Sequence, residues 1–561
     1  MKHFLTGLAS YNKTEIQKNS DFYNTWHNKT YYEDYLTVNE DEKGEFLQVY
    51  ENQKNDSHPP LYYLLLRIAM SFNIGKYSKW PGIILNIIIY LFITIFMYLI
   101  ISKLLKEKSK YKEKSAVLAF ISSITLASIT NAIFIRMYAL ATLNIVITTY
   151  LHLKLLDKES KNGLLLIGIS ISALIGSLTH YYYLFYLAML CIMFVTKYIK
   201  EKKYKLLWKY VLAMVFAGTL SLIIFPYSIN HIFFGDRGQG VISNLANMYK
   251  YLSNVIIYML ITNVYIFNNT LWILTIVIII ILIYKLFKHI KIVNTKNKYT
   301  KYIALPTIFY FLVVSICSPF LELRYILPIS QMIFILIIYF VISILSNICK
   351  EKAINKIVII IFLIMFIMVF VSNRLIDLII GIEYRNEKEE FYSSKIELVE
   401  KLENECNIPS NLIPQIEEMP LSNILLFMKD FRIEPQVLYS NMSDIVEKIN
   451  TNLKNVPAIY LLNSTNNRFL DDILLFAEIK ESYIAKDIDY SKENISEILK
   501  DKDISNGLII FINDWQNNEE ILGVVKDTTN LQNITYLKRL NMCDVYYIDW
   551  HNMHFLIKYI R

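Results

Sequence analysis

The sequence predicts an α-helical polytopic membrane protein with about ten transmembrane helices and a C-terminal soluble α/β domain. Two observations carry this fold class. Apolar segments long enough to span a bilayer recur between residues 83 and 373, and the chain becomes polar after Val371. Hydrophobic residues make up 54% of the 561 residues, against 19% charged residues. A soluble protein of this length has no need of so many long apolar runs.

The predicted transmembrane segments alternate with short polar connections. They lie at residues 83–105, 115–135, 137–156, 163–179, 182–199, 208–229, 270–288, 302–317, 325–347 and 355–373. Lysine-rich connections occur at residues 103–114, 154–161, 197–209, 285–301 and 350–356. These connections share one side if the segments alternate, and the positive-inside rule makes that side cytoplasmic. They also explain most of the net charge of +8, which therefore does not imply a nucleic-acid partner.

A further apolar segment at residues 252–268 affects this topology. A span there would move the lysine-rich connection 285–301 to the outside of the membrane. We therefore expect an external interfacial or re-entrant helix at this position. A true eleventh span is the alternative.

Three regions are expected along the chain: a first external loop at residues 1–82, a transmembrane domain at 83–380 and an external α/β domain at 381–561. Alternating strands and helices predict the α/β domain. The strands are expected at 423–428, 458–462, 508–513, 534–537 and 544–548, and the helices at 444–453 and 491–499. The cysteines have no metal-type spacing and predict neither a disulfide nor a metal site; they are Cys191, Cys317, Cys349, Cys406 and Cys543.

The most informative stretch of the first region is Asp56-Ser57-His58-Pro59-Pro60-Leu61-Tyr62-Tyr63. The two prolines exclude a helix through them, so a helix at residues 61–70 can begin just after Pro60. Asp56 and His58 then stand on rigid backbone ahead of a helix N-terminus, which favours anions. Asp56 is a candidate general base or metal ligand, and His58 a candidate phosphate or metal ligand. A solvated carboxylate and a hydrogen-bonded cap are the alternatives.

Other polar residues gather at the predicted external ends of the spans. Arg136 follows an apolar run and is a candidate bidentate clamp for a lipid phosphate. Its alternative is an arginine that snorkels to the interface. His180 and Tyr181 begin an aromatic run that can form a platform for a sugar, although an aromatic belt is equally expected there.

Two more arginines lie on this predicted external side. Arg237 stands in the turn at residues 235–240, which lacks the following lysine and hydroxyl residue of a Walker phosphate loop. Arg324, next to Tyr325, can face a lipid phosphate or form a self-contained ion pair with Glu322. Ionisable residues near membrane segments are expensive and commonly mark a substrate path, so their gathering on one side suggests a site.

These motifs resemble those of bacterial glycosyltransferase family 39-like membrane proteins. This family of C-type glycosyltransferases is related to protein O-mannosyltransferases and to the lipid A aminoarabinose transferase. The acidic-x-His-Pro-Pro signature at residues 56–60 carries most of the resemblance. It continues, over roughly residues 1–345, through Arg136-Met137-Tyr138-Ala139-Leu140, Thr179-His180-Tyr181-Tyr182, Gly235-Asp236-Arg237-Gly238 and Arg324-Tyr325.

The resemblance implies the C-type fold and transfer of a sugar from a polyprenyl-phosphate donor, usually with inversion, at the outer face of the plasma membrane. It implies catalytic roles for Asp56 and His58. It implies substrate contacts for Arg136, Tyr138, His180, Tyr181, Arg237, Arg324 and Tyr325. A phosphate leaving group needs cationic stabilisation and an acceptor hydroxyl needs a base, so these residue types suit the reaction. A divalent cation and the nature of the acceptor (lipid, glycan or protein) are left open.

The chain departs from the family pattern at its start. Family members begin with one more span and an Asp-Glu pair whose aspartate is the expected base, whereas this chain opens Met1-Lys2-His3-Phe4-Leu5. We expect either a misplaced start or a chain without that base. A catalytically inactive homologue that binds a lipid-linked sugar is therefore one alternative. A lipid-linked oligosaccharide transporter is another, although it should carry charges within its spans.

Overall fold

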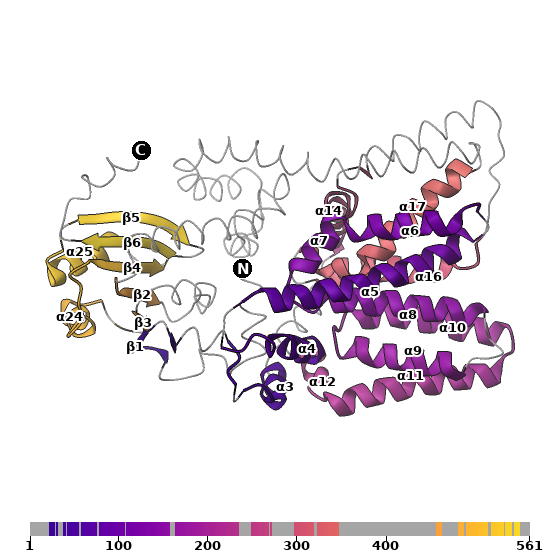
Figure 1. The fold of residues 1–561 in the computed structure, drawn as a ribbon, viewed down its shortest axis with the longest axis horizontal. Coiled ribbons are helices and arrows are strands. Elements are labelled where there is room, and N and C mark those ends of the chain that lie inside the picture. Colours follow the sequence, from indigo (N-terminus) through magenta and orange to yellow (C-terminus); the bar gives the residue numbers. More distant parts are fainter. Residues whose placement is uncertain are drawn as a thin grey trace. The chain divides into compact units, whose positions relative to one another are not determined.

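A computed structural model describes residues 22–28, 30–31, 37–40, 42–54, 58–75, 78–106, 108–157, 163–234, 248–268, 270–271, 297–318, 322–346, 456–462, 481–486, 488, 490–513, 518–531, 533–540 and 543–549. The chain divides into two compact units (Figure 1). The helical unit comprises residues 56–62 and 82–431, and the sheet unit comprises residues 1–55, 63–81 and 432–561. The boundary falls within helix α4 (Leu61–Met70), which begins just after Pro60 as predicted.

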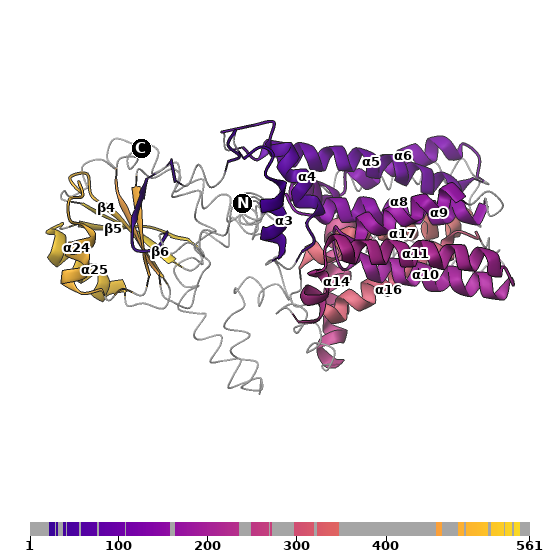
Figure 2. The same ribbon diagram turned by 90° about the horizontal axis from the view of Figure 1, so that it is seen from below.

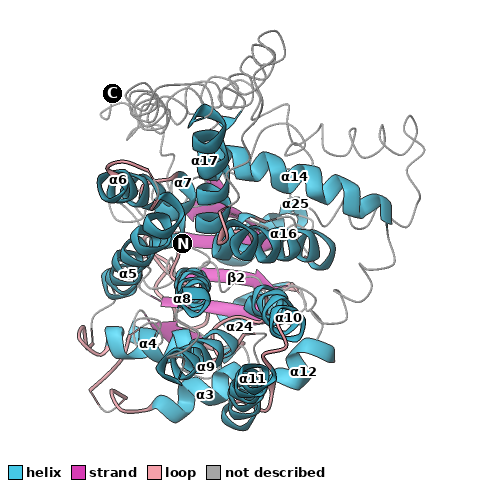
Figure 3. Cartoon of the chain, turned by 90° about the vertical axis from the view of Figure 1, so that its right-hand side faces the viewer, coloured by secondary structure: helices cyan, strands magenta, loops and turns pink. Residues whose placement is uncertain are grey.

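Long apolar helices build the helical unit, and Figure 2 shows several of them side by side. They are α5 (Trp80–Leu105), α6 (Tyr111–Ser123), α7 (Leu126–Ile133), α8 (Tyr138–Asp157), α9 (Gly163–Ser177), α10 (Tyr183–Lys200), α11 (Tyr204–Ile224), α12 (Ser228–Phe233), α14 (Met248–Phe267), α16 (Thr300–Cys317) and α17 (Ser330–Ser346), with the short 3-10 turns η3 (Leu323–Tyr325) and η4 (Leu327–Ile329) before α17. Seen end on, α8 lies among α9, α10, α16 and α17 (Figure 3). The apolar part of α8 is 67% buried, against 11% for α11. The segment Leu327–Leu345, which includes most of α17, is 67% buried as well, so α8 and α17 are interior helices and α11 is a peripheral one.

The helices coincide with the predicted spans at 83–105, 115–135, 137–156, 163–179, 182–199, 208–229, 302–317 and 325–347. The predicted spans at 270–288 and 355–373 lie outside the described residues. Within the described part of the chain, five helices are long and apolar enough to cross a membrane, or six if the bent α6–α7 pair counts as one span. These are features of a multi-pass membrane protein. The ten-span count, the sidedness and the interfacial role of α14 stay predictions.

The predicted span at 115–135 is not one continuous helix. It breaks between α6 and α7, whose axes differ in direction by 57°. The Thr125 side chain accepts a hydrogen bond from the Ser128 N–H at 3.2 Å and caps α7. The Ser122 and Ser123 hydroxyls donate to carbonyls of the preceding turn. Such bonds compete with the helical ones, so the cluster of serine and threonine residues explains the break.

Buried polar pairs join α8 to its neighbours. The Thr148 hydroxyl lies 2.7 Å from that of Tyr183 on α10, and the Thr149 hydroxyl lies 2.9 Å from that of Tyr186. His152 Nε2 lies 2.9 Å from the hydroxyl of Tyr210 on α11. Lipid gives helices little hydrophobic reason to associate, so hydrogen bonds of this kind help to fix their packing.

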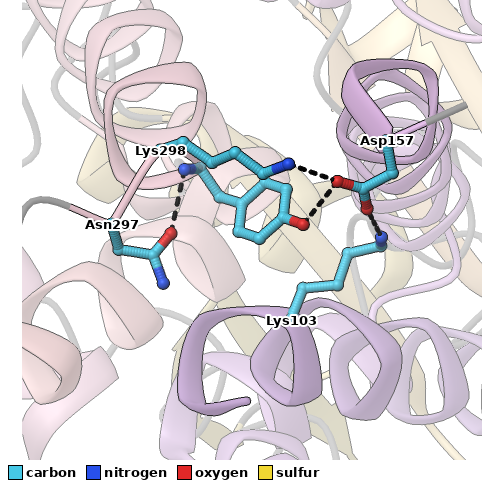
Figure 4. A network of polar contacts seen from close by, with 5 residues as sticks. Lys103, Asp157, Asn297 and Lys298 are labelled. Carbon is cyan, nitrogen blue, oxygen red and sulfur yellow. Dashed lines mark hydrogen bonds and ion pairs between the residues drawn. The ribbon is translucent and has the colours of Figure 1, made fainter. Parts of the chain in front are cut away.

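One carboxylate ties three helices together at the end of α8 (Figure 4). Asp157 accepts hydrogen bonds from Lys103 of α5, from Lys298 at 2.7 Å and from the Tyr299 hydroxyl at 2.6 Å. Asn297 accepts the Tyr299 backbone N–H at 2.9 Å and so orients the start of α16. The hydrogen bond that Lys298 donates to the Asp157 carboxylate raises the pKa of Lys298. α5, α8 and α16 are therefore fixed at one common end.

A six-stranded mixed sheet forms the core of the sheet unit, in the order β1-β3-β2-β4-β6-β5. The elements are β1 (Trp26–Asn28), α3 (Phe46–Lys54), β2 (Ala458–Leu462), β3 (Glu481–Lys486), α24 (Lys492–Ile498), β4 (Leu508–Asn513), α25 (Asn518–Thr529), β5 (Asn533–Leu540) and β6 (Cys543–Asp549). The β2 strand pairs in parallel with β3 and β4, and the other neighbours are antiparallel. Apolar residues of α24 and α25 pack on one face, among them Ile495, Ile498 and Val525.

The strands predicted at 458–462, 508–513, 534–537 and 544–548 and the helix predicted at 491–499 are confirmed as β2, β4, parts of β5 and β6, and α24. The strand predicted at 423–428 and the helix at 444–453 lie outside the described residues. β1, β3 and α25 were not predicted. β1 is the unexpected element, because it comes from the first region of the sequence and forms an edge of this sheet.

Side chains hold β1 against β3. The Asn24 side chain bonds both the N–H of Lys486, at 2.8 Å, and its carbonyl, at 3.1 Å. The Trp26 indole donates to the Ile498 carbonyl at 2.9 Å, and its ring lies 5.5 Å from that of Tyr483. The Lys502 ammonium lies 4.5 Å from the Trp26 ring, close enough for a cation–π contact. Trp26 is therefore the main anchor of this strand.

Replacing Asp157 by Asn should lower the stability of the helical unit by about 1–2 kcal/mol, because two ammonium groups lose their charged acceptor. Thermal unfolding of purified protein in detergent measures the change. Glu201→Gln, at an exposed carboxylate that pairs with Lys197 and Lys203 in the turn between two helices, is the matched control and should cost less than about 0.5 kcal/mol. Equal unfolding temperatures for the two variants would contradict the role given to Asp157.

Trp26→Ala should loosen β1 from the sheet, since one side chain supplies a hydrogen bond, a ring contact and a cation–π contact. Hydrogen exchange followed by mass spectrometry should show amides of Trp26–Asn28 and Glu481–Lys486 exchanging at least about tenfold faster, the equivalent of 1.4 kcal/mol. Tyr536→Ala, an exposed ring on the opposite edge strand, should leave both peptides unchanged. Unchanged exchange in Trp26→Ala would show that the backbone alone holds β1.

Candidate functional site

The candidate site lies at the end of the helical unit where α8 and α10 begin. The segment that carries His58 is fastened there. The N–H of Leu61 donates to the Leu178 carbonyl at 3.2 Å. The Tyr62 hydroxyl donates to Asn86 of α5 at 3.1 Å, and Asn86 in turn donates to the Phe134 carbonyl at 2.9 Å. His58 is consequently buried, with 8% of its surface exposed.

A chain of rings runs from His58 across this end of the unit. The His180 ring lies 6.4 Å from that of His58, 5.3 Å from Tyr138 and 5.3 Å from Tyr182. Tyr182 lies 5.6 Å from Tyr325. His180 Nδ1 accepts the N–H of Tyr182 at 3.1 Å, which fixes its ring at the start of α10. Four segments distant in the sequence thus supply one cluster of aromatic and imidazole rings, which we call the ring cluster (His58, Tyr138, His180, Tyr182 and Tyr325).

Arg324 brings a positive charge to the ring cluster. Its guanidinium lies 5.2 Å from the centre of the Tyr325 ring and donates to Glu322 at 2.6 Å. Its side chain is 16% exposed, and its Nε has no hydrogen-bond partner within the described residues. The Tyr325 hydroxyl interacts with this guanidinium but makes no hydrogen bond of good geometry within the same residues. Burial acts to lower the Arg324 pKa, but Tyr138, Tyr325 and Glu322 outweigh it and the pKa is raised, so the cation persists.

Two buried tyrosines hold the loop that presents Arg324. The Tyr310 hydroxyl, on α16, donates to the Tyr325 carbonyl at 3.0 Å. The Tyr258 hydroxyl, on α14, donates to Ser318 at 2.9 Å. Both phenols are fully buried. An arginine on a short 3-10 turn would otherwise move freely, so these bonds give it a fixed position.

The remaining predicted site residues do not belong to the ring cluster or lie outside the described residues. Tyr181 lies outside the ring contacts given above, with its hydroxyl 2.9 Å from Nδ1 of His231 on α12. Arg136 is half-buried in the turn before Tyr138, where its N–H donates to the Phe134 carbonyl at 2.7 Å. The structure brings together His58, Tyr138, His180, Arg324 and Tyr325. Asp56 and Arg237 lie outside the described residues.

The described residues offer no ready metal centre. No three His, Cys, Asp or Glu side chains among them come close enough to hold a metal ion. The groups that the described part of the site offers are a guanidinium, phenols and imidazoles. Such groups can bind an anion through charge and hydrogen bonds and can stack on an apolar sugar face.

Sequence reasoning missed Tyr310, and it placed Tyr182 in the aromatic run after His180 without singling it out. In the run from Tyr181 to Tyr183, the periodicity of one sequence does not tell which ring faces His180, because the run starts in a turn and ends in α10. Tyr310 stands in the middle of an apolar helix, where a tyrosine is usual. Only the observed hydrogen bond to the Tyr325 carbonyl reveals its role.

No protein-family profile matches this chain, and no curated protein matches it. The chain is similar to two crystal structures of ArnT from Cupriavidus metallidurans. The structure bound to undecaprenyl phosphate is 10% identical, with 97% of this chain and 96% of that chain covered and a TM-score of 0.46. The structure in the apo state is 10% identical, with 97% and 95% covered and a TM-score of 0.45.

Tyr310→Phe should free the η3 turn, because the Tyr325 carbonyl loses its buried donor at a cost of about 1–3 kcal/mol. Amides of residues 322–326 should then exchange roughly tenfold faster in a hydrogen-exchange experiment. Tyr204→Phe, at a tyrosine that is 55% exposed, is the control and should change nothing. If exchange at residues 322–326 is equal in both variants, Tyr310 does not hold the turn.

Proposed function

We propose that this protein is a membrane glycosyltransferase that moves a sugar from a polyprenyl-phosphate donor to an acceptor hydroxyl. The observation that carries the proposal is the half-buried guanidinium of Arg324 beside the ring cluster, whose buried Nε has no hydrogen-bond partner within the described residues. A buried donor without a partner calls for an explanation, and a bound phosphate supplies one. The resemblance of the motifs around His58, Tyr138, His180 and Arg324 to family 39-like enzymes supports the same conclusion.

Each group has a role in this proposal. The Arg324 guanidinium has five N–H donors, and Glu322 accepts a hydrogen bond from one of its NH2 groups. The remaining donors can hold the phosphate and stabilise the negative charge that develops on it as the sugar leaves. The phenol and imidazole rings offer faces for the sugar and donors for its hydroxyls. Arg136 and Arg237 are proposed as further phosphate contacts, and Tyr181 as a further ring of the substrate site.

Asp56 is proposed as the base that takes the proton of the acceptor hydroxyl. It precedes His58 by two residues, and His58 lies in the ring cluster. The attacking oxygen forms the new bond to the anomeric carbon as the bond to the phosphate oxygen breaks, so the polyprenyl phosphate leaves with the electron pair. We propose that transfer takes place at the outer face of the plasma membrane.

Arg324→Ala and Asp56→Asn should each reduce transfer from a radiolabelled polyprenyl-phosphate sugar by about 100-fold or more, since one removes charge stabilisation and the other the base. Lys112→Ala, at an exposed lysine, is the control and should keep wild-type turnover. Wild-type turnover in either site variant would show that the substituted residue does not take part in transfer.

Binding measurements distinguish an enzyme from the two alternatives, a binding homologue and a transporter. Arg324→Ala should weaken the binding of polyprenyl phosphate by about 10- to 100-fold, through loss of a charge-assisted contact. Glu322→Gln should strengthen it, because the competing carboxylate charge is removed. Tight binding without transfer by the wild type would favour a binding homologue. Movement of a labelled lipid across vesicle membranes without transfer would favour a transporter.

A further inference from the structure

The turn between α10 and α11 concentrates positive charge at the end of the helical unit opposite the ring cluster. The end of α10, where this turn begins, lies beside the start of α16, because the ring of Phe194 on α10 is 5.2 Å from the ring of Tyr302 on α16. The charged residues of the turn are Lys197, Lys200, Glu201, Lys202, Lys203, Lys205 and Lys209. We call residues 197–209 the basic turn.

The acid of the basic turn is already neutralised. Glu201 accepts hydrogen bonds from Lys197 at 2.8 Å and pairs with Lys203 at 2.7 Å. The hydrogen bonds from Lys197 and Lys203 lower the pKa of Glu201, so Glu201 stays ionised and paired with these two lysines. The other lysines of the turn form no ion pair within the described residues; they are Lys200, Lys202, Lys205 and Lys209. All four are exposed. A cluster of unpaired positive charge therefore faces outward.

An apolar stripe begins in the same turn and continues down α11. Tyr204, Trp208 and Leu212 follow each other at intervals of four residues, and are 55%, 64% and 62% exposed. That spacing places them on one face of the helix. Lys205 and Lys209 each follow one of the two rings by one residue, so they flank the stripe. Aromatic rings with lysines beside them are typical of the boundary between acyl chains and head groups.

The rest of α11 sets the surroundings of this stripe. α11 is long and apolar enough to cross a membrane, and only 11% of its apolar part is buried within the protein. The exposed stripe is therefore continuous with the exposed apolar surface of α11, which is suited to contact with lipid. Exposed rings with lysines beside them suit the level of the lipid head groups better than a soluble acidic partner, which would have to cover the apolar rings as well as the charges.

We propose that the basic turn is a binding site for anionic phospholipid head groups, with Trp208 and Tyr204 as interfacial anchors and Lys202, Lys205 and Lys209 as phosphate contacts. The two ring faces seat against the upper acyl chains while the lysines reach the phosphates. Attraction between the lysines and anionic lipids is electrostatic and weakens with salt. This site is independent of sugar transfer.

The test uses the full-length protein in vesicles that contain brominated phosphatidylglycerol or brominated phosphatidylcholine. Bromine quenches nearby tryptophan, and the Trp208 contribution is the difference between wild type and Trp208→Phe. We expect Trp208 to be quenched at least about threefold more by the anionic lipid at low salt, with the preference lost in 1 M salt. Equal quenching by the two lipids would overturn the proposal.

A charge-matched pair of variants tests the site itself. The triple variant Lys202→Gln, Lys205→Gln, Lys209→Gln should lose the anionic preference. The control Lys108→Gln, Lys110→Gln, Lys112→Gln removes as much charge from the connection between α5 and α6 and should keep it. Loss of preference in both variants would mean attraction by the overall field and would also overturn the proposal. Thermal unfolding confirms that each variant is folded.

Discussion

One carboxylate holds together the helices on which the candidate site depends. Asp157 ends α8 and accepts hydrogen bonds from α5 and from residues just before α16. α8 begins about 30 Å away, at 1.5 Å per residue, with Tyr138 beside His180. α16 ends before the turn that carries Arg324. Because α8 and α16 are joined at the end far from the site, the position of Tyr138 along the helix axes is fixed relative to that of Arg324.

Burial gives the two ends of the helical unit different chemistry. At one end the half-buried Arg324 cation lies against the Tyr325 ring, and its turn is fixed through Tyr310 and Tyr258. At the other end, lysines of the basic turn are exposed beside an apolar stripe. A buried cation on a fixed turn can select one phosphate in one geometry, whereas exposed lysines hold many head groups loosely. The first suits catalysis and the second suits anchoring.

Much of the helical architecture could be predicted, because apolar runs of spanning length are a strong local signal. The start of the helix after Pro60 could also be predicted from a local signal, because each proline restricts its own backbone and that of the residue before it. The break before α7 was missed because it depends on serine and threonine side chains that bond back to the chain. β1 was missed because pairing with β3 joins residues more than 450 positions apart, which no local pattern reveals. The sequence could not single out Tyr182 from its aromatic run for a similar reason, because its contact with Tyr325 depends on how α10 packs.

The most direct test of the account is a structure of the protein with polyprenyl monophosphate bound. The account predicts that the phosphate lies within hydrogen-bond distance of the Arg324 guanidinium, with Nε among its donors, and beside the ring cluster. A phosphate that binds only among the lysines of the basic turn, with Arg324 still paired to Glu322 alone, would contradict the proposed site.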